Sequence, residues 1–85
     1  MTFDPEKDRR NIAKHGISLA RWVDMEMLAV VIDDRFDYGE ERYRAFGRIG
    51  ARAYCLTFTL REGIVRPISL RRCHAWEIGL YEKKT

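Results

Sequence analysis

The chain has only two cysteines among its 85 residues, Cys55 and Cys73, too few for the disulfide framework of a small secreted domain. Its longest apolar run, residues 27–32, is far shorter than the roughly 20 residues that cross a membrane. The first residues show no apolar segment of the kind found in a signal peptide. We therefore expect a cytoplasmic protein with reduced thiols and no membrane contact.

Several common site patterns are also lacking. His74 directly follows Cys73, and no second pair of cysteine or histidine residues has zinc-ligand spacing, so we expect no metal and no cofactor. Gly47 and Gly50 fall within an expected hairpin rather than before a helix, which argues against a phosphate-binding glycine loop. Repeats and linkers are lacking too, and we expect residues 1–85 to form a single small domain.

Acidic residues are scarce in the second half of the chain. Residues 42–72 contain eight arginines and a single acid, Glu62, whereas residues 1–41 contain ten acidic and six basic residues. The net charge of the segment 42–72 is therefore +7. Because the planar guanidinium group suits bidentate contact with phosphate, this pattern predicts a surface for a polyanion. The alternative is that half of these arginines lie on a solvated sheet face.

The order of helix and strand signals predicts an α+β fold with two N-terminal helices, a four-stranded, mainly antiparallel sheet and a C-terminal helix. The first helix is expected over residues 5–15, because Asp4 is a good N-cap, Pro5 suits the first helical position and Gly16 can end a helix. The second helix is expected to begin after Ser18 and to carry the apolar residues Leu19, Trp22, Val23, Met25 and Met27.

Four strands are expected between the helices, over residues 29–32, 42–49, 51–60 and 64–70, with the end of the first strand and a loop over 33–41. In the second strand, Tyr43, Ala45, Gly47 and Ile49 alternate with Arg42, Arg44, Phe46 and Arg48. Glu62-Gly63 predicts a hairpin, and Pro67 predicts an edge strand or a bulge. The C-terminal helix is expected over residues 73–83, with Trp76 and Leu80 on one side.

Three segments resemble the BrnT family of toxins, which belong to the RelE-like group of type II toxin–antitoxin systems. They are FDPEKDRRNIAKHGIS at residues 3–18, GEERYRAFG at 39–47 and ISLRRCHAWEIGLYE at 68–82, in the order and spacing of the family. The resemblance implies a RelE-like fold and a metal-independent endoribonuclease that inhibits translation and growth. It also implies neutralisation by a BrnA-type antitoxin similar to ribbon-helix-helix proteins. RNA would be the substrate, and operator DNA would be bound only through the antitoxin complex.

RNA cleavage without a metal needs a base for the 2′-hydroxyl, an acid for the 5′-oxygen and positive charge around the phosphorane. Arg71 matches the arginine of the family pattern Ile-Ser-Ala-Arg, in which Leu70 here replaces the alanine, and is our first choice for phosphate stabilisation. Arg42 matches the Glu-Arg of the family and is expected either to hold a phosphate or to pair with a carboxylate. Further phosphate contacts are expected from Arg44, Arg48, Arg66 and Arg72.

The remaining candidate catalytic residues are Lys14, His15, Glu41 and Tyr81. His15 lies at a helix end whose dipole favours the protonated imidazole, so it is expected to be a general acid or a phosphate contact, or simply to end the helix. Lys14 can contact phosphate, although successive helical side chains point about 100° apart. Glu41 is expected to be a base or to orient a neighbouring cation. Tyr81 matches a family tyrosine and is expected to pack in the core or to contact a phosphate or a base.

Two other classes of function stay open from the sequence. A non-catalytic nucleic-acid-binding module would need only the basic strands, and would bind RNA with steep salt dependence without cutting it. An interaction protein would use the same basic face to bind an acidic partner. Detection of RNA cleavage would distinguish a ribonuclease toxin from both of these alternatives.

Overall fold

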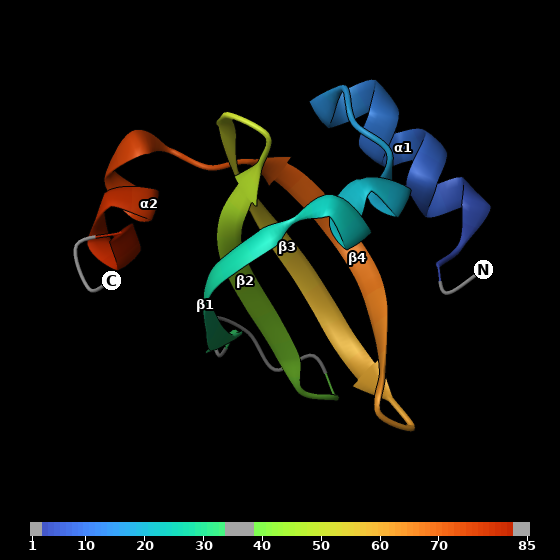
Figure 1. Cartoon of the computed structure of the whole chain (residues 1–85). Coiled ribbons are helices and arrows are strands. Elements are labelled where there is room, and N and C mark those ends of the chain that lie inside the picture. Colours follow the sequence, from blue (N-terminus) through green and yellow to red (C-terminus); the bar gives the residue numbers. More distant parts are fainter. Residues whose placement is uncertain (1–2, 34–38, 83–85) are drawn as a thin grey trace.

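The computed structural model describes residues 3–33 and 39–82, without the side chains of residues 75 and 80–82. In chain order these residues form helix α1 (Pro5–His15), the 3-10 helix η1 (Leu19–Asp24), strands β1 (Glu26–Asp33), β2 (Arg42–Ile49), β3 (Arg52–Arg61) and β4 (Ile64–Arg72), and helix α2 (Ala75–Glu82) (Figure 1). All three strand pairs are antiparallel, which confirms the α+β class and the four-stranded sheet. None of the helices described is long and apolar enough to span a membrane.

α1 begins and ends at the residues that the sequence predicts. The Asp4 side chain accepts a hydrogen bond of 2.9 Å from the backbone N–H of Glu6. At the other end, the N–H of Gly16 donates to the carbonyl of Ile12, with a φ of 73° at the glycine. This left-handed conformation is unfavourable for residues that carry a Cβ, so Gly16 ends the helix immediately after His15.

The second helix is shorter than predicted. η1 ends at Asp24, and Met25 and Met27 lie in extended chain and in β1, so the prediction that they continue the helix is wrong. Met25 is buried in the core beside the sheet, and β1 pairs with β2 from Glu26 onward. Strand pairing and burial therefore outweigh the helical spacing of the apolar residues.

The strand boundaries agree with the prediction at β2 and extend it at β1. The predicted strand 42–49 coincides with β2, whereas the predicted strand 29–32 is only part of β1. The predicted hairpin at residues 62–63 joins β3 to β4. Of the predicted strand end and loop over residues 33–41, Asp33 ends β1 as expected, and residues 34–38 lie outside the part of the chain that the structure describes.

Pro67 marks both an edge strand and a register shift. The strand order is β1-β2-β3-β4, so β4 lies at one edge of the sheet. Thr57 lies opposite Ser69 and Phe58 opposite Pro67, so Ile68 is an additional residue in β4. Because proline cannot donate to a strand ladder, this edge position with a bulge is where it costs least.

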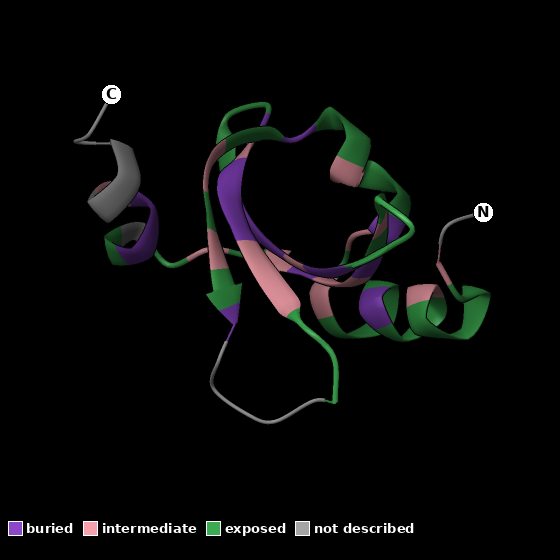
Figure 2. Ribbon diagram, turned by 90° about the horizontal axis from the view of Figure 1, so that it is seen from below, coloured by how far each residue is buried: buried purple, intermediate pink, exposed green. Residues whose placement is uncertain are grey.

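The sheet is strongly curled, and η1 crosses its inner face (Figure 2). The predicted alternation along β2 is confirmed, because Ala45 and Ile49 share one core cluster with Leu19 of η1, whereas Phe46 packs in a separate cluster. The main core consists of Leu19, Met25, Ala45, Ile49, Tyr54, Leu56, Phe58 and Leu70. Leu70 is fully buried in this core, so its larger side chain points to the face opposite to that of its neighbour Arg71.

A smaller cluster on the other face joins the sheet to α2. Phe46 and Cys55 pack there against Ile78, and burial raises the pKa of the Cys55 thiol to about 11. Trp76 is 69% exposed, so Ile78 rather than Trp76 forms the sheet-facing side of α2. The side chain of Leu80, the predicted partner of Trp76, lies outside the described residues.

Gly47 lies where the backbone of β1 approaches β2 most closely. A Cβ at this position would lie 2.1 Å from the carbonyl oxygen of Glu26, which is far inside van der Waals contact. The register between the two strands also shifts here, between Met27 and Ala29. Only glycine fits without displacing β1.

We therefore predict that Gly47→Ala lowers the free energy of unfolding by about 2 kcal/mol, because the methyl group pushes β1 away from β2. Urea denaturation measures this change. The matched control is Gly79→Ala in α2, where a Cβ would meet nothing within 4 Å. That change is expected to leave stability unaltered or to raise it by up to about 1 kcal/mol. Equal destabilisation by the two substitutions would contradict the close approach.

Candidate active site

One buried side chain, Asn11, fixes α1 against the free edge of β4. Its amide group donates hydrogen bonds of 2.8 Å to the carbonyls of Leu70 and Ile17. Its side-chain oxygen accepts a hydrogen bond of 3.0 Å from the N–H of Leu70. Asn11 thus satisfies both backbone groups that an edge strand leaves open at this residue. The end of α1 is thereby held beside the C-terminal end of β4.

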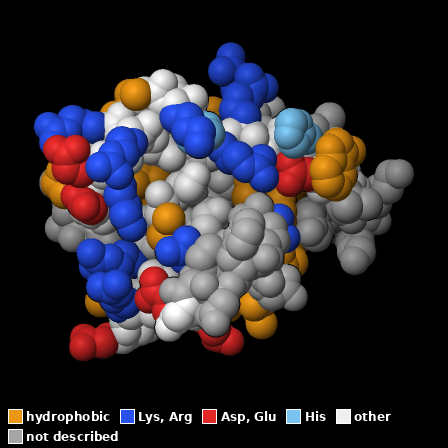
Figure 3. Space-filling model, turned by 180° about the vertical axis from the view of Figure 1, so that it is seen from behind, with side chains coloured by type: hydrophobic (Ala, Val, Ile, Leu, Met, Phe, Trp, Pro, Cys, Tyr) orange, Lys and Arg blue, Asp and Glu red, His pale blue; other side chains and the backbone are white. Residues whose placement is uncertain are grey.

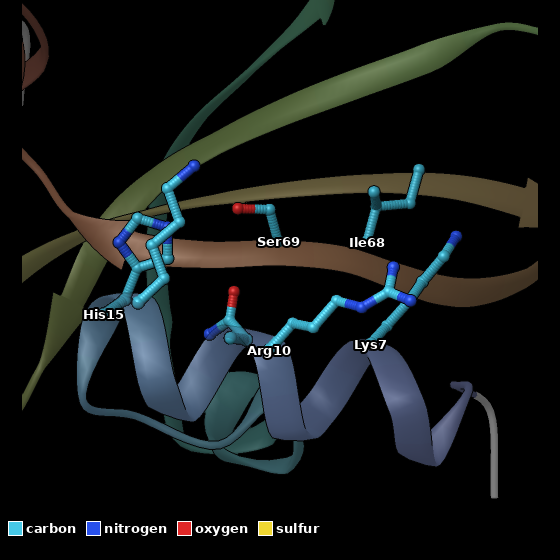
Figure 4. Close-up of a pocket in the computed structure, with 7 residues that line it drawn as sticks. Lys7, Arg10, His15, Ile68 and Ser69 are labelled. Atoms are coloured by element: carbon cyan, nitrogen blue, oxygen red, sulfur yellow. The ribbon is translucent and has the colours of Figure 1, made fainter.

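A groove of about 190 Å³ runs between α1 and β4. Its lining consists of Lys7, Arg10, Asn11, Lys14 and His15 from the helix, and Ile68 and Ser69 from the strand. The other four helical residues follow Lys7 by three, four, seven and eight positions, which places all five along one side of α1. Arg10 and Lys7 extend along β4 near Ile68, whereas His15 lies beside the C-terminal end of the strand (Figure 4). None of the described residues that line the groove is acidic.

Two of the predicted site residues line the His15 end of the groove, and a third is near enough to act on His15 through its charge. Lys14 and His15 both line it, and the positive charge of Arg71 acts on the imidazole. Burial, followed by the charges of Lys14 and Arg71, lowers the pKa of His15 below its ordinary value. The expected preference for the protonated imidazole is therefore contradicted, because burial and these cations outweigh the helix dipole, which acts in the opposite direction.

Arg71 is held in place by Glu77, a residue that the sequence analysis missed. The Arg71 guanidinium donates hydrogen bonds of 3.3 Å to both carboxylate oxygens of Glu77, which is only 6% exposed. The same carboxylate accepts a hydrogen bond of 3.1 Å from the backbone N–H of His74. Burial would raise the pKa of Glu77, but the hydrogen bonds from Arg71 and His74 outweigh it and hold the pKa below its ordinary value.

The local sequence did contain a signal for Glu77. His74 precedes the first residue of α2, and Glu77 is the third helical residue. A glutamate at this position commonly reaches back to the backbone N–H that precedes the helix. The same reach brings its carboxylate next to the end of β4, where Arg71 lies.

The other predicted arginines are divided between the two faces of the sheet. The strand register places Arg42, Arg44, Arg48 and Arg66 on the face of Arg71, and Arg72, which pairs with Tyr54, on the opposite face. Arg44 already lies 4.0 Å from the buried carboxylate of Asp33 and over the ring of Phe46. Figure 3 shows basic side chains and both histidines spread over one side of the molecule.

Glu41 is not part of this arrangement, and the side chain of Tyr81, in α2, lies outside the described residues. Phe46 is level with Arg71 across the sheet, and Glu41 lies five residues before it, about 16 Å away at ~3.3 Å per residue. The Glu41 carboxylate accepts a hydrogen bond of 2.7 Å from the Tyr43 hydroxyl, and Arg42 lies at the same distant end of the sheet.

Comparison with protein families shows the family to which the chain belongs. A family model described as ribonuclease toxin, BrnT, of type II toxin–antitoxin system matches residues 3–77. The matched segment contains α1, the whole sheet and Glu77. No curated protein and no solved structure matches the chain.

The environment of His15 gives a prediction about pH. Because burial and the charges of Lys14 and Arg71 lower its pKa, His15 takes up its proton at a lower pH than an ordinary imidazole does. The folded state then binds fewer protons than the unfolded state, so stability falls as the pH drops through this range. An NMR titration of the imidazole is expected to show a midpoint that rises in Lys14→Gln, which removes one of the two cations. Arg52→Ala, a change on the opposite sheet face, is the control and leaves the midpoint unchanged.

Proposed function

Because the chain belongs to the BrnT family of ribonuclease toxins of type II toxin–antitoxin systems, we propose that RNA is cleaved at the His15 end of the groove. The proposal is that residues 1–85 form one RelE-like domain, and that this domain is a metal-independent endoribonuclease that inhibits translation and growth. The observation that carries it is the convergence of Lys14, His15 and Arg71 from elements distant in sequence.

Arg71 would contact the scissile phosphate. Three hydrogen bonds from its guanidinium go to Glu77 and to the Arg72 carbonyl, and a guanidinium has five N–H groups. The remaining N–H groups are available for phosphate oxygens, and the side chain is 30% exposed. Glu77 is a positioning residue in this scheme, because it fixes the plane of the guanidinium without facing the groove.

His15 would act as the base. A neutral imidazole can accept the proton of the 2′-hydroxyl as that oxygen attacks phosphorus and the bond to the 5′-oxygen breaks. The lowered pKa of His15 supports this role over that of the acid. Lys14 lines the same end of the groove and is our candidate for protonating the departing 5′-oxygen or for stabilising the phosphorane.

The charge of the groove supports metal independence. The charged residues that line it are cationic, so a divalent cation would be repelled, and the positive charge that a metal often supplies comes from side chains. Membership of the family implies an antitoxin partner. We propose that this partner is a BrnA-type, ribbon-helix-helix protein in the same cytoplasm, and that operator DNA is bound only through the complex.

The proposed role of Arg71 predicts that Arg71→Ala lowers the cleavage rate at least ~100-fold and abolishes growth arrest, because phosphorane stabilisation is lost. The assay is cleavage of purified RNA in EDTA by a protein whose fold is checked by circular dichroism. Arg71→Lys keeps the charge beside Glu77 but loses the planar fork, and is expected to be strongly impaired as well. Arg52→Ala is the control. Full activity of both Arg71 variants would refute the assignment, and binding of RNA without any cleavage by the natural protein would favour a non-catalytic module.

The positioning role of Glu77 has its own test. Gln at this position can still accept from the His74 N–H but no longer carries the charge that orients Arg71. Glu77→Gln is expected to lower kcat about tenfold with little change in KM, because the interaction improved by orientation is that with the transition state. Equal losses in kcat and in the amount of folded protein would indicate a purely structural role.

A further inference from the structure

The groove continues beyond the site of cleavage along the length of α1. Lys7, Arg10 and Lys14 line it at steps of three and four residues, which correspond to about 4.5 and 6 Å along a helix. Their charges therefore form a row parallel to the helix axis and not a single cluster. Of the three, only Lys14 has a part in the proposed chemistry.

A second pocket prolongs the same row. Lys7 and Ile68 line both pockets, so the two are contiguous at the start of α1. Arg61 and Arg66 line the second pocket from the end of the sheet near the β3–β4 hairpin. This more distant pocket also contains carboxylates, from Asp4 and Glu40. The stretch without any acidic lining residue is therefore the one between Lys7 and His15.

We propose that Lys7, Arg10 and Lys14 form a track for the phosphates of single-stranded RNA that leads to His15 and Arg71. This inference rests on the proposed function and adds the path of the substrate. Among the described residues that line the groove, none is a phenylalanine, tyrosine or tryptophan on which bases could stack. The track thus grips the sugar–phosphate backbone and contributes affinity without base preference.

RNA fits this row better than an acidic protein segment does. A single strand carries one negative charge on each nucleotide, at regular intervals, and the row leads directly to the residues placed for phosphodiester cleavage. An acidic segment of the antitoxin is the competing occupant, and the test below distinguishes the two.

The helix offers a matched control in adjacent residues. Arg9 and Arg10 carry the same charge, but Arg9 pairs with Glu6 and lines a different pocket, beside Phe3 and Ser18. Arg10→Ala and Arg9→Ala therefore remove identical charges from the two sides of α1. Both side chains are exposed, so the fold is expected to tolerate either change.

The experiment measures binding of a fluorescent 2′-O-methyl RNA oligonucleotide, which lacks the attacking hydroxyl and is not cut, over a range of salt concentrations. The plot of log K against log salt has a negative slope, and each lost phosphate contact reduces the size of this slope by about 0.7 for a single strand. A lower slope therefore means a shallower salt dependence. Arg10→Ala is expected to lower the slope by about 0.7 and the double variant Lys7→Ala/Arg10→Ala by about 1.4, with no change in Arg9→Ala.

Three results would overturn the track. Equal slopes in the Arg9 and Arg10 variants would show that the side of the helix does not matter. A lower slope in Arg48→Ala, with none in Arg10→Ala, would place the RNA across the sheet face. If the Arg10 variants bound the antitoxin more weakly but bound RNA as well as the natural protein does, the groove would be the binding site of the antitoxin and not of RNA.

The outcomes also separate this inference from the proposed function. Inactive Arg71 variants together with an unchanged slope in Arg10→Ala would leave the cleavage site standing and remove the track. A lowered slope with no cleavage by the natural protein would leave the track and remove the proposed enzyme.

Discussion

Asn11 reaches from α1 to the free edge of β4 and takes up the N–H and the carbonyl of Leu70, together with the carbonyl of Ile17. Left unsatisfied in a buried position, each of these groups would cost about 1–3 kcal/mol, so the helix has one preferred position on the strand. The same position sets the groove, because the side of α1 that carries Asn11 also carries Arg10, Lys14 and His15. One side-chain amide thereby fixes both the docking of the helix and the distance of His15 from the end of β4.

The second constraint acts at the other side of the site. Glu77 is nearly buried, accepts hydrogen bonds from Arg71 and from the start of α2, and so joins the C-terminal helix to the arginine. The carboxylate is satisfied by Arg71 without lining the cationic groove, which stays suited to phosphate. Burial, followed by the charges of Lys14 and Arg71, lowers the pKa of His15 below its ordinary value.

Local signals predicted the fold best where they act over a few residues. Asp4 and Gly16 mark the two ends of α1 as expected, because helix caps and left-handed glycines act on neighbouring backbone groups. The length of the second helix was overestimated, because Met25 packs in the core and the residues after it belong to the sheet. His15 and Arg71, which the family pattern singled out, lie near the same end of α1 in the structure, whereas Glu77, Lys7 and Arg10 were not among the residues expected from the sequence. The position of Glu77 near the start of α2 predicts its hydrogen bond to the His74 N–H, but no spacing in the sequence reveals its contact with Arg71 or the position of Lys7 and Arg10 beside β4.

The sequence by itself determined the class of fold, the excess of arginine after residue 42 and the family to which the chain belongs, because composition, caps and alternation are properties of short segments. The tertiary structure alone decided which charges share a site. It placed Arg71 beside Glu77 and near His15, turned the neighbouring Arg72 to the other face, and left Glu41 at the distant end of the sheet. Strand register and the docking of α1 made that choice, because a shift of one residue along a strand moves a side chain from one face to the other.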